Sequence, residues 1–286
     1  MRKADKNHYD TLTRLLSEEA VSDKGQEVRP RYADGTPAYT NFITNVIQEY
    51  DIAKGELPFL LLRPTAWKHA VNEIFWIYQD ASNDISLLKE KYGINYWDDW
   101  NIGDGTIGQR YGATVKKYDL LNNLVEGIKE NPYGRRHIMS LWQEEDFKTE
   151  GLNPCCFMTM WTVRGEYLDC TLVQRSSDYI VSVAINEVQY VALQMMIAKT
   201  CGLQPGKFSH YIANLHIYDR HLKEAGEMIN RYENMKNMEI NGDIKITEPR
   251  FIFSPQNNNF YDFNINQFSL QNYEPIKPQL KFELGI

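Results

Sequence analysis

Residues 156–178 read CFMTMWTVRGEYLDCTLVQRSSD, and this stretch decides the fold. Aromatic, β-branched and other apolar residues run on both sides of Arg164-Gly165, a dipeptide that favours a tight turn. The pattern predicts strands at 156–163 and 167–174, paired as a β-hairpin.

Apolar residues at helical spacing predict helices on both sides of this hairpin. The clearest follows Arg63-Pro64-Thr65, and another begins near Asn186 and stops at Gly202, a residue that commonly ends helices. The elements also include helices at 8–19, 120–128 and 219–232, strands at 42–50, 57–62, 137–142 and 208–214, and polar loops at 22–38 and 92–115. We therefore expect an α/β fold of the α+β type, with a mixed β-sheet packed by helices in a single domain, residues 1–286.

The composition is that of a folded protein rather than a disordered one. The 286 residues are 43% hydrophobic and 13% aromatic, with a net charge of −7. An acidic balance argues against binding to DNA or to a membrane surface, because both require a basic field. No signal-peptide core or long apolar span is apparent, and four cysteines without metal spacing predict neither a disulfide scaffold nor a metal site. We expect a cytoplasmic protein.

Cys155 is the candidate nucleophile. It follows Asn153-Pro154 at the mouth of a predicted strand, whereas Cys170 and Cys201 fall on apolar positions where cysteine is an ordinary buried residue. Alternation along the strand points Cys155 and Cys156 to opposite faces, so at most one of them belongs to a site. A thiolate is a strong nucleophile, and neighbouring cations favour it by lowering the thiol pKa.

Arginines near this cysteine in the sequence indicate an anion site. Gln174, Arg175 and Ser176 end the second strand, and the doublet Arg135-Arg136 follows a turn. Guanidinium groups bind phosphate with two parallel hydrogen bonds. A solvent-exposed arginine pair is the alternative for the doublet, and no Walker or Rossmann glycine motif explains the anion site otherwise.

Other polar residues have a structural and a functional interpretation each. Glu73 lies on an otherwise apolar helix, where burial would raise its pKa toward that of a proton donor, unless it only forms a structural ion pair. Trp97 is either a loop anchor or a surface for a flat heterocycle. Asp178 and Asn186 suit loop or helix caps, whereas His216 and Tyr218 share one face at a strand end.

Taken in order, these segments resemble the thymidylate synthase family over essentially the whole chain. The resemblance rests on motifs that include Asn72-Glu73-Ile74-Phe75-Trp76, Gly108-Gln109-Arg110-Tyr111-Gly112, Pro154-Cys155, Gln174-Arg175-Ser176-Ser177-Asp178 and His216-Ile217-Tyr218. It implies the reductive methylation of dUMP to dTMP. The reduced folate 5,10-methylenetetrahydrofolate is the co-substrate and supplies both carbon and hydride, and no metal is implied.

The resemblance also implies a role for each matching residue. Cys155 would attack C6 of the uracil ring, with Glu73, Tyr111 and Asn186 as the other catalytic residues. A homodimer is implied, in which Arg135 and Arg136 reach the site of the other subunit. The nucleotide would be bound by Arg29, Arg135, Arg136, Gln174, Arg175, Ser176, Asp178, Asn186, His216 and Tyr218, and the folate by Trp97, Asp178 and Ile286.

Four features depart from the family pattern. Two of them are Ala213-Asn214, which stands where Gly-Asp is commoner, and Arg63-Pro64, which replaces a Lys-Arg-type pair. Cys156 stands where many members have a histidine, and residues 181–185 replace a more usual Leu-Gly-x-Pro-Phe. A dUMP 5-hydroxymethylase of the same fold, in which water rather than hydride captures the methylene intermediate, is the nearest alternative. A non-catalytic nucleotide- or RNA-binding relative would lack the nucleophile, and a thiol hydrolase using Cys155 with His216 leaves the arginines unexplained.

Overall fold

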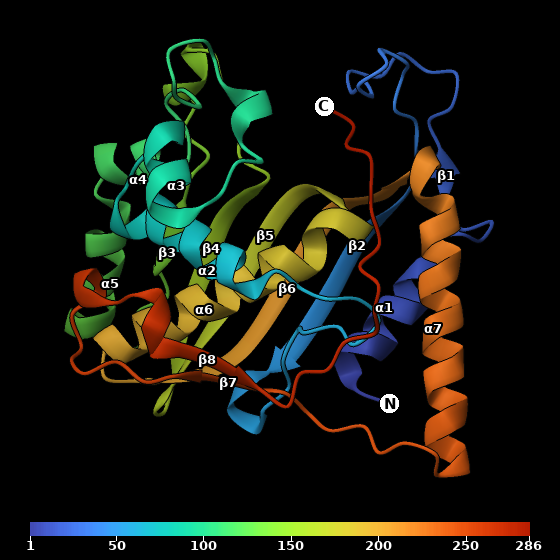
Figure 1. The fold of residues 1–286 in the computed structure, drawn as a ribbon. Helices are drawn as coiled ribbons and strands as arrows, with labels where there is room; N and C mark the ends of the chain where they lie inside the picture. The colour runs from blue at the N-terminus through green and yellow to red at the C-terminus, as the bar shows by residue number, and fades with distance from the viewer.

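A six-stranded mixed sheet forms the centre of the structure, a computed structural model that describes residues 1–286 (Figure 1). The strand order is β1-β2-β6-β5-β4-β3, and every neighbouring pair is antiparallel except β5 and β6. The strands are β1 (Val21–Ser22), β2 (Thr40–Asp51), β3 (Ile138–Ser140), β4 (Cys156–Arg164), β5 (Tyr167–Asp178) and β6 (Gln204–Tyr218). This arrangement confirms the expected α+β class with a mixed sheet.

The predicted hairpin is present and forms the β4–β5 pair. Its turn contains Gly165 with φ 64°, a left-handed conformation that glycine adopts without steric cost. The ladder keeps one register from Arg164 to Met158 and then shifts by one residue at a bulge, so that Cys156 pairs with Gln174. The shift matters because it brings Cys155 opposite Arg175, whose backbone N–H donates to the Cys155 carbonyl at 3.0 Å.

Helices cover one face of the sheet and lie along its two lateral edges. Figure 1 shows α2 (Trp67–Ile74) and α6 (Ala184–Thr200) crossing one face, and α1 (Lys3–Leu15) beside α7 (Leu222–Asn241) at one edge. The remaining elements are a π-helical turn (Phe75–Gln79), α3 (Ile85–Tyr92), α4 (Gly112–Lys117), α5 (Leu120–Glu130), a second π-helical turn (Tyr179–Val183), and the hairpin β7 (Arg250–Phe253) with β8 (Phe268–Gln271). Short 3₁₀ turns complete the chain at 52–54, 98–100, 146–148, 219–221, 260–262 and 265–267.

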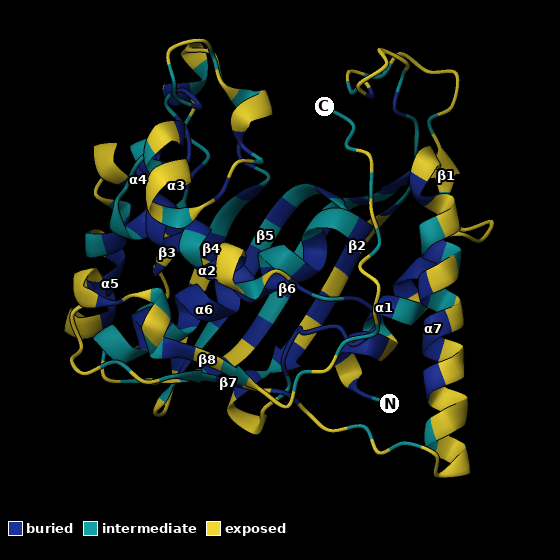
Figure 2. Cartoon of the chain, viewed as in Figure 1, coloured by how far each residue is buried: buried dark blue, intermediate teal, exposed yellow.

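The core lies between the sheet and the crossing helices. Figure 2 shows α6 buried or half-buried along its length, and along β5 buried residues alternate with half-buried ones. Because side chains of a strand point alternately to its two faces, one face of the sheet is sealed by the helices and the other stays partly open. The buried apolar side chains form one main cluster that joins the sheet, α2 and α6.

Two predicted elements differ from the structure in kind. Residues 57–62 are buried but form no strand, because their backbone groups are bound by side chains from distant segments instead of a neighbouring strand. Asn186 does not cap its helix, because the helix already begins at Ala184 and a π-helical turn precedes it. The expected cap at Asp178 is present, since its carboxylate accepts from the Val181 N–H at 3.3 Å.

Other boundaries moved by several residues. The first helix begins at Lys3 and ends at Leu15 rather than spanning 8–19, and the loop at 92–115 already contains the start of α4. β5 and β6 both continue past their predicted ends, to Asp178 and Tyr218. As a result, several candidate site residues lie at the same end of neighbouring strands.

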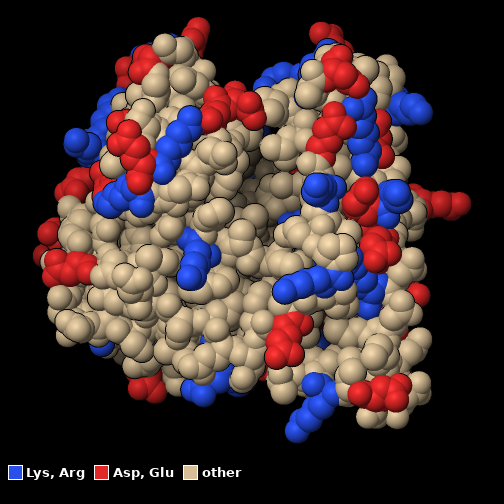
Figure 3. All heavy atoms as spheres, in the orientation of Figure 1, with Lys and Arg blue, Asp and Glu red and all other residues tan.

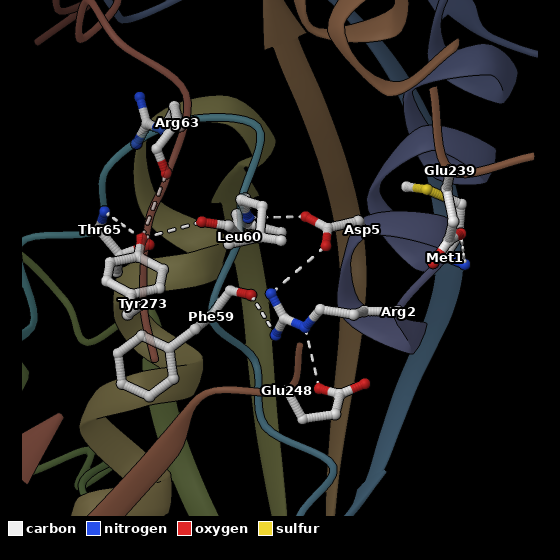
Figure 4. A network of polar contacts seen from close by, with 11 residues as sticks. Met1, Arg2, Asp5, Phe59, Leu60, Arg63, Thr65, Glu239, Glu248 and Tyr273 are labelled. Carbon is white, nitrogen blue, oxygen red and sulfur yellow. Dashed lines mark hydrogen bonds and ion pairs between the residues drawn. The ribbon is translucent and has the colours of Figure 1, made fainter. Parts of the chain in front are cut away.

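Side chains from the two ends of the chain hold the segment at 59–65 (Figure 4). The Arg2 guanidinium donates to the Phe59 carbonyl at 2.8 Å, and the Asp5 carboxylate accepts from the Leu61 N–H at 2.7 Å. The Tyr273 hydroxyl donates to the Leu60 carbonyl at 2.9 Å. Burial raises the pKa of Asp5 to about 6, despite the neighbouring Arg2.

The α6 segment is long and apolar enough to cross a membrane by length and composition. It spans Tyr179–Thr200 when the preceding turn is included, which corrects the expectation that the chain contains no such run. However, 78% of its apolar window is buried inside the fold. A segment packed in this way is typical of the central helix of a folded domain.

Candidate active site

A cleft of about 700 Å³ opens between the loops at one end of the sheet (Figure 3). Figure 3 shows mostly uncharged side chains at the visible surface of the hollow and charged side chains of both signs around its rim. The size is typical of a site for small organic ligands. Most of the predicted site residues line it, namely Arg29, Glu73, Trp97, Tyr111, Cys155, Gln174, Arg175, Ser176, Asp178, Asn186, His216, Tyr218 and Ile286.

Cys155 lies in this cleft just before β4, half-buried and free of any disulfide. The Arg175 Nη2 lies 3.5 Å from its Sγ. Burial raises the pKa of the Cys155 thiol, whereas the Arg175 and Arg29 guanidinium groups act to lower it. The two cations therefore offset part of the cost of forming a thiolate in a site that excludes water. Cys156 is buried in the core, yet it also lines the cleft, so the expectation that only one of the two cysteines reaches the site does not hold.

Arg175 is held in place by the turn that it faces. Its Nε donates to the Pro154 carbonyl at 3.0 Å, and its Nη2 donates to the Asn153 carbonyl at 2.8 Å. These bonds fix the guanidinium plane beside the cysteine without neutralising its charge. With Arg29 and Ser176 on the same cleft wall, the arrangement can hold an anion next to a nucleophile.

Glu73 is 7% exposed and is surrounded by hydrogen-bond donors on α2's inner face. Trp97 Nε1 donates to its Oε1 at 3.0 Å, the Tyr96 hydroxyl donates to its Oε2, and Gln189 also bonds to it. Burial raises the pKa of Glu73, and these donors limit the rise by stabilising the ionised form. No cation pairs with it, so the structural ion pair considered from the sequence is wrong.

Tyr111 bridges the glutamate and the cysteine regions. Its hydroxyl accepts from the Cys155 N–H at 3.1 Å, and its ring packs on Trp97 with centroids 5.1 Å apart. Burial raises the pKa of Tyr111, which keeps its hydroxyl protonated. The residue has φ 48°, a conformation that costs about 1–3 kcal/mol for a residue with a side chain and persists only when its surroundings hold it.

Asn186 presents its amide to the cleft from the first turn of α6. Its Oδ1 accepts from Gln174 Nε2 at 3.2 Å, and its Nδ2 donates to Gln189 Oε1 at 2.9 Å. An amide oxygen has two acceptor positions and an amide nitrogen two hydrogens. The Asn186 oxygen thus keeps one acceptor site free, and its nitrogen keeps one hydrogen free. Together they can bind a neighbouring donor and acceptor on a planar ring.

The far wall of the cleft comes from β5, β6 and the last residues of the chain. The ladder pairs Asp178 with His216, and the imidazole Nδ1 of His221 lies 3.5 Å from Asp178 Oδ2. Burial raises the pKa of Tyr218 to about 12, so its hydroxyl stays a donor, and it lies 3.4 Å from the Gly285 carbonyl. Ile286 is anchored by two backbone hydrogen bonds to Arg31, at 2.7 and 2.9 Å.

Arg135 and Arg136 do not enter this cleft. Both side chains are exposed and line a second cavity of about 690 Å³ between α5 and β3, with Tyr133 and His137. Within one chain they therefore cannot contribute to the anion site beside Cys155, and neither takes part in a salt bridge or side-chain hydrogen bond.

Three residues of the site escaped the sequence reasoning. Tyr96 binds Glu73, and Gln189 links Asn186 to Glu73. His221 lies between Asp178 and the C-terminal segment, and its Nε2–H donates to the Glu283 carbonyl at 2.7 Å. A signal existed for Gln189, because residues three apart share a helix face. Tyr96 and His221 depend on tertiary contacts and carried no comparable signal.

The cleft thus combines a thiol beside guanidinium groups with a buried carboxylate and an amide that offers one donor and one acceptor. That set suits nucleophilic attack on a polar planar ring, followed by proton transfer. No group of three or more His, Cys, Asp or Glu side chains is arranged to hold a metal ion.

Comparisons with known proteins place this cleft in context. The family model described as thymidylate synthase matches residues 9–286. Among curated proteins, the chain is 46% identical over 293 aligned residues to a thymidylate synthase of Lactococcus lactis subsp. lactis and 47% identical to one of Streptococcus gordonii, covering all of each chain. Among solved structures, the thermostable thymidylate synthase A from Bacillus subtilis superposes with a TM-score of 0.88 at 31% identity, with 99% of each chain covered.

Proposed function

The chain belongs to the thymidylate synthase family, and from this premise we propose which of its residues carry each step of the reaction. The activity is that of a methyltransferase: dUMP is methylated to dTMP, and 5,10-methylenetetrahydrofolate supplies the carbon and the hydride and leaves as dihydrofolate. The observation that carries the assignment of residues is the 3.5 Å separation between Cys155 Sγ and Arg175 Nη2 inside the cleft.

Cys155 is the proposed nucleophile. Its sulfur adds to C6 of the uracil ring, the C5–C6 double bond becomes an enolate, and C5 then bonds to the methylene carbon of the folate. Loss of the C5 proton and elimination of tetrahydrofolate leave an exocyclic methylene, which accepts hydride from the tetrahydrofolate while the C6–S bond breaks. The carbon therefore arrives at the oxidation level of formaldehyde and leaves as methyl, and the folate is oxidised.

The phosphate and sugar of dUMP are proposed to lie between β5, β6 and the 29–31 segment. Arg29, Arg175 and Ser176 offer the charge and donors that a phosphate needs, and His216 and Tyr218 offer partners for the deoxyribose hydroxyl. Asn186 would accept from uracil N3–H and donate to O4, which disfavours cytosine because that ring reverses the pattern. Gln174 supports Asn186 from behind, at 3.2 Å.

Glu73 and Tyr111 are proposed to manage protons on the uracil. Burial raises the pKa of Glu73, which makes its carboxyl group better suited to hold and pass on a proton at the O4 side of the ring. Tyr111 lies against Cys155 through the 3.1 Å contact with its backbone N–H. Because its hydroxyl stays protonated, it would assist the removal of the C5 proton by hydrogen bonding to a water molecule rather than as a phenolate.

The folate is proposed to bind over the nucleotide. Trp97 would line its ring, Asp178 would bond to the pterin, and the Ile286 carboxylate would close the cleft over both ligands. The C-terminal segment already lies at the cleft, because Ile286 pairs with Arg31 through the backbone.

A homodimer is proposed, with Arg135 and Arg136 completing the phosphate site of the other subunit. Both arginines are exposed and unpaired in the single chain. The open face of the sheet offers a surface for the second copy, because Met158, Val173, Tyr211 and Ile47 form a continuous row across four strands and none is fully buried. Exposed apolar rows of this kind mark protein interfaces. We also propose one domain over residues 1–286 and a cytoplasmic location.

Product analysis tests the methylation. With dUMP and 5,10-methylenetetrahydrofolate, we expect dTMP and dihydrofolate in equal amounts. Hydroxymethyl-dUMP without dihydrofolate would instead indicate the alternative hydroxymethylase, which the comparisons do not support.

Mixed dimers test the shared site. Arg136→Ala is expected to weaken dUMP binding, and Cys155→Ser to abolish turnover while leaving most nucleotide binding intact. In a heterodimer of the two variants, one site keeps both a wild-type cysteine and a wild-type arginine, so part of the activity should return. No recovery in verified heterodimers would contradict the contribution of Arg136 across the interface.

A further inference from the structure

A buried acid–imidazole pair lies behind the cleft, outside the residues assigned above. His210 on β6 is 0% exposed and Glu187 on α6 is 2% exposed. Glu187 Oε1 lies 3.4 Å from His210 Nδ1, and its Oε2 accepts from the Tyr50 hydroxyl at 3.1 Å. Burying two titratable groups costs free energy, which makes an unexplained pair in the core a candidate for a role.

The pair connects directly to the cleft. His210 Nε2 lies 2.7 Å from Gln174 Oε1, and Gln174 Nε2 donates both to the Ser176 carbonyl at 3.1 Å and to Asn186 Oδ1 at 3.2 Å. Gln174 is itself buried. A continuous series of hydrogen bonds therefore runs from Glu187 in the core to the amide that faces the ligand.

This series determines which end of each amide faces which partner. Reversing the Gln174 amide would place its oxygen against the Ser176 carbonyl and Asn186 Oδ1, leaving acceptors facing acceptors, and its nitrogen against a protonated His210 Nε2. Reversing Asn186 alone would place its nitrogen against the Gln174 nitrogen, with donors facing donors. The observed orientation is the one in which all of these contacts are satisfied.

The orientation depends on a proton at His210 Nε2, and Glu187 secures that proton. Burial raises the pKa of Glu187, which favours a protonated carboxyl group that donates to Nδ1 and so keeps the ring hydrogen on Nε2. Without a partner at Nδ1, the ring is free to move its hydrogen there and to present a lone pair to Gln174.

We propose that Glu187 and His210 are positioning residues that set the choice of uracil over cytosine. They fix Gln174, and Gln174 fixes Asn186 with its oxygen ready to accept from N3–H and its nitrogen ready to donate to O4. Cytosine requires the reversed amide, which this series resists. The inference rests on the proposed role of Asn186 and adds the element that holds Asn186 in one orientation.

The test compares dissociation constants for dUMP and dCMP in variants of the full-length protein. In His210→Phe, the dUMP preference is expected to fall about three- to tenfold, the range expected for losing one buried hydrogen bond. Glu187→Met removes the partner of Nδ1 and should lower the preference in the same direction. Glu187→Gln can still donate to Nδ1 and accept from Tyr50, and should keep the preference near that of the wild type.

Gln194→Met is the matched control for damage to the core. Gln194 is also a buried polar residue of α6, but its Nε2 donates to the Leu168 and Lys207 carbonyls, away from the cleft. It should lower the thermal midpoint without changing the ratio of the two constants. An unchanged ratio in Glu187→Met, whether or not His210→Phe folds, would overturn the inference.

Asn186→Ala separates this inference from the function on which it rests. If Asn186→Ala loses the dUMP preference while Glu187→Met and His210→Phe keep it, the positioning role is wrong and the proposed role of Asn186 stands. If Asn186→Ala keeps the full preference, the proposed role of Asn186 is itself wrong, and the positioning role is overturned with it.

Discussion

Replacing Arg175 by glutamine should make Cys155 a much poorer nucleophile. The substitution removes the positive charge 3.5 Å from the sulfur and leaves Arg29 as the other cation that lowers the thiol pKa. Burial of Cys155 continues to oppose the thiolate. The balance of these effects should therefore shift toward the neutral, unreactive thiol.

The geometry gives an order of magnitude for the loss. At 3.5 Å, and with an effective dielectric constant of about 20, the attraction between two unit charges is about 5 kcal/mol, an upper bound before solvent enters the vacated space. If about a third to a half of it is lost on substitution, the thiolate population falls by roughly tenfold to a hundredfold, since each 1.4 kcal/mol is a factor of ten.

The rate of alkylation by iodoacetamide measures this population, because only the thiolate reacts. The comparison belongs in a Cys201→Ser background, since Cys201 is the other partly exposed thiol, and the rate should be followed from pH 6 to 10. Arg175→Lys is the matched control: it keeps a charge but loses the bonds to the turn, so its rate should fall less. If Arg175→Gln reacts at the wild-type rate at every pH, the guanidinium does not activate the cysteine.

Two further predictions concern stability. Because burial raises the pKa of Asp5 from 3.8 to about 6, the protonated side chain contributes to the free energy of unfolding below pH 4. This contribution, about 3 kcal/mol, is lost as the pH rises through 6. Urea unfolding at several pH values should show the loss in the wild type and not in Asp5→Asn. Gly112, which follows Tyr111, approaches the backbone of Ser82 so closely that an alanine Cβ there would lie 2.1 Å from the Ser82 carbonyl oxygen. Gly112→Ala should therefore lower the free energy of unfolding by several kcal/mol, measured with denaturant. Gly226→Ala is the control, because its Cβ would meet no atom within 4 Å and the change should be neutral or stabilising. Equal stabilities of the two alanine variants would contradict the close approach at Gly112.

Local patterns predicted the local parts of the fold. The β4–β5 hairpin and α5 follow from alternation, helical spacing and turn residues within one short stretch. The segment at 57–62 looked like a strand for the same reason, yet Arg2, Asp5 and Tyr273 bind its backbone. These partners are far away in the sequence, and no local pattern reveals them.

The site was predicted as a set of residues but not as an arrangement. The motifs named Cys155 and Arg175, but their contact depends on a one-residue shift at a bulge in β4, which residue types do not disclose. The parallel pairing of β5 with β6 brings Asp178 beside His216, and a helix of 17 residues separates those strands in the chain. Glu187 and His210 passed unnoticed because each looks like an isolated polar residue until the fold joins them.

The covalent bond between Cys155 and the pyrimidine is the central claim, and 5-fluoro-dUMP tests it most directly. Fluorine at C5 cannot leave as a proton does, so incubation with this nucleotide and 5,10-methylenetetrahydrofolate should trap the intermediate before elimination. Mass spectrometry of the digested protein should then show nucleotide and folate together on the peptide that contains Cys155. An adduct on a different residue, or the absence of any adduct from a preparation that makes dTMP, would contradict the account.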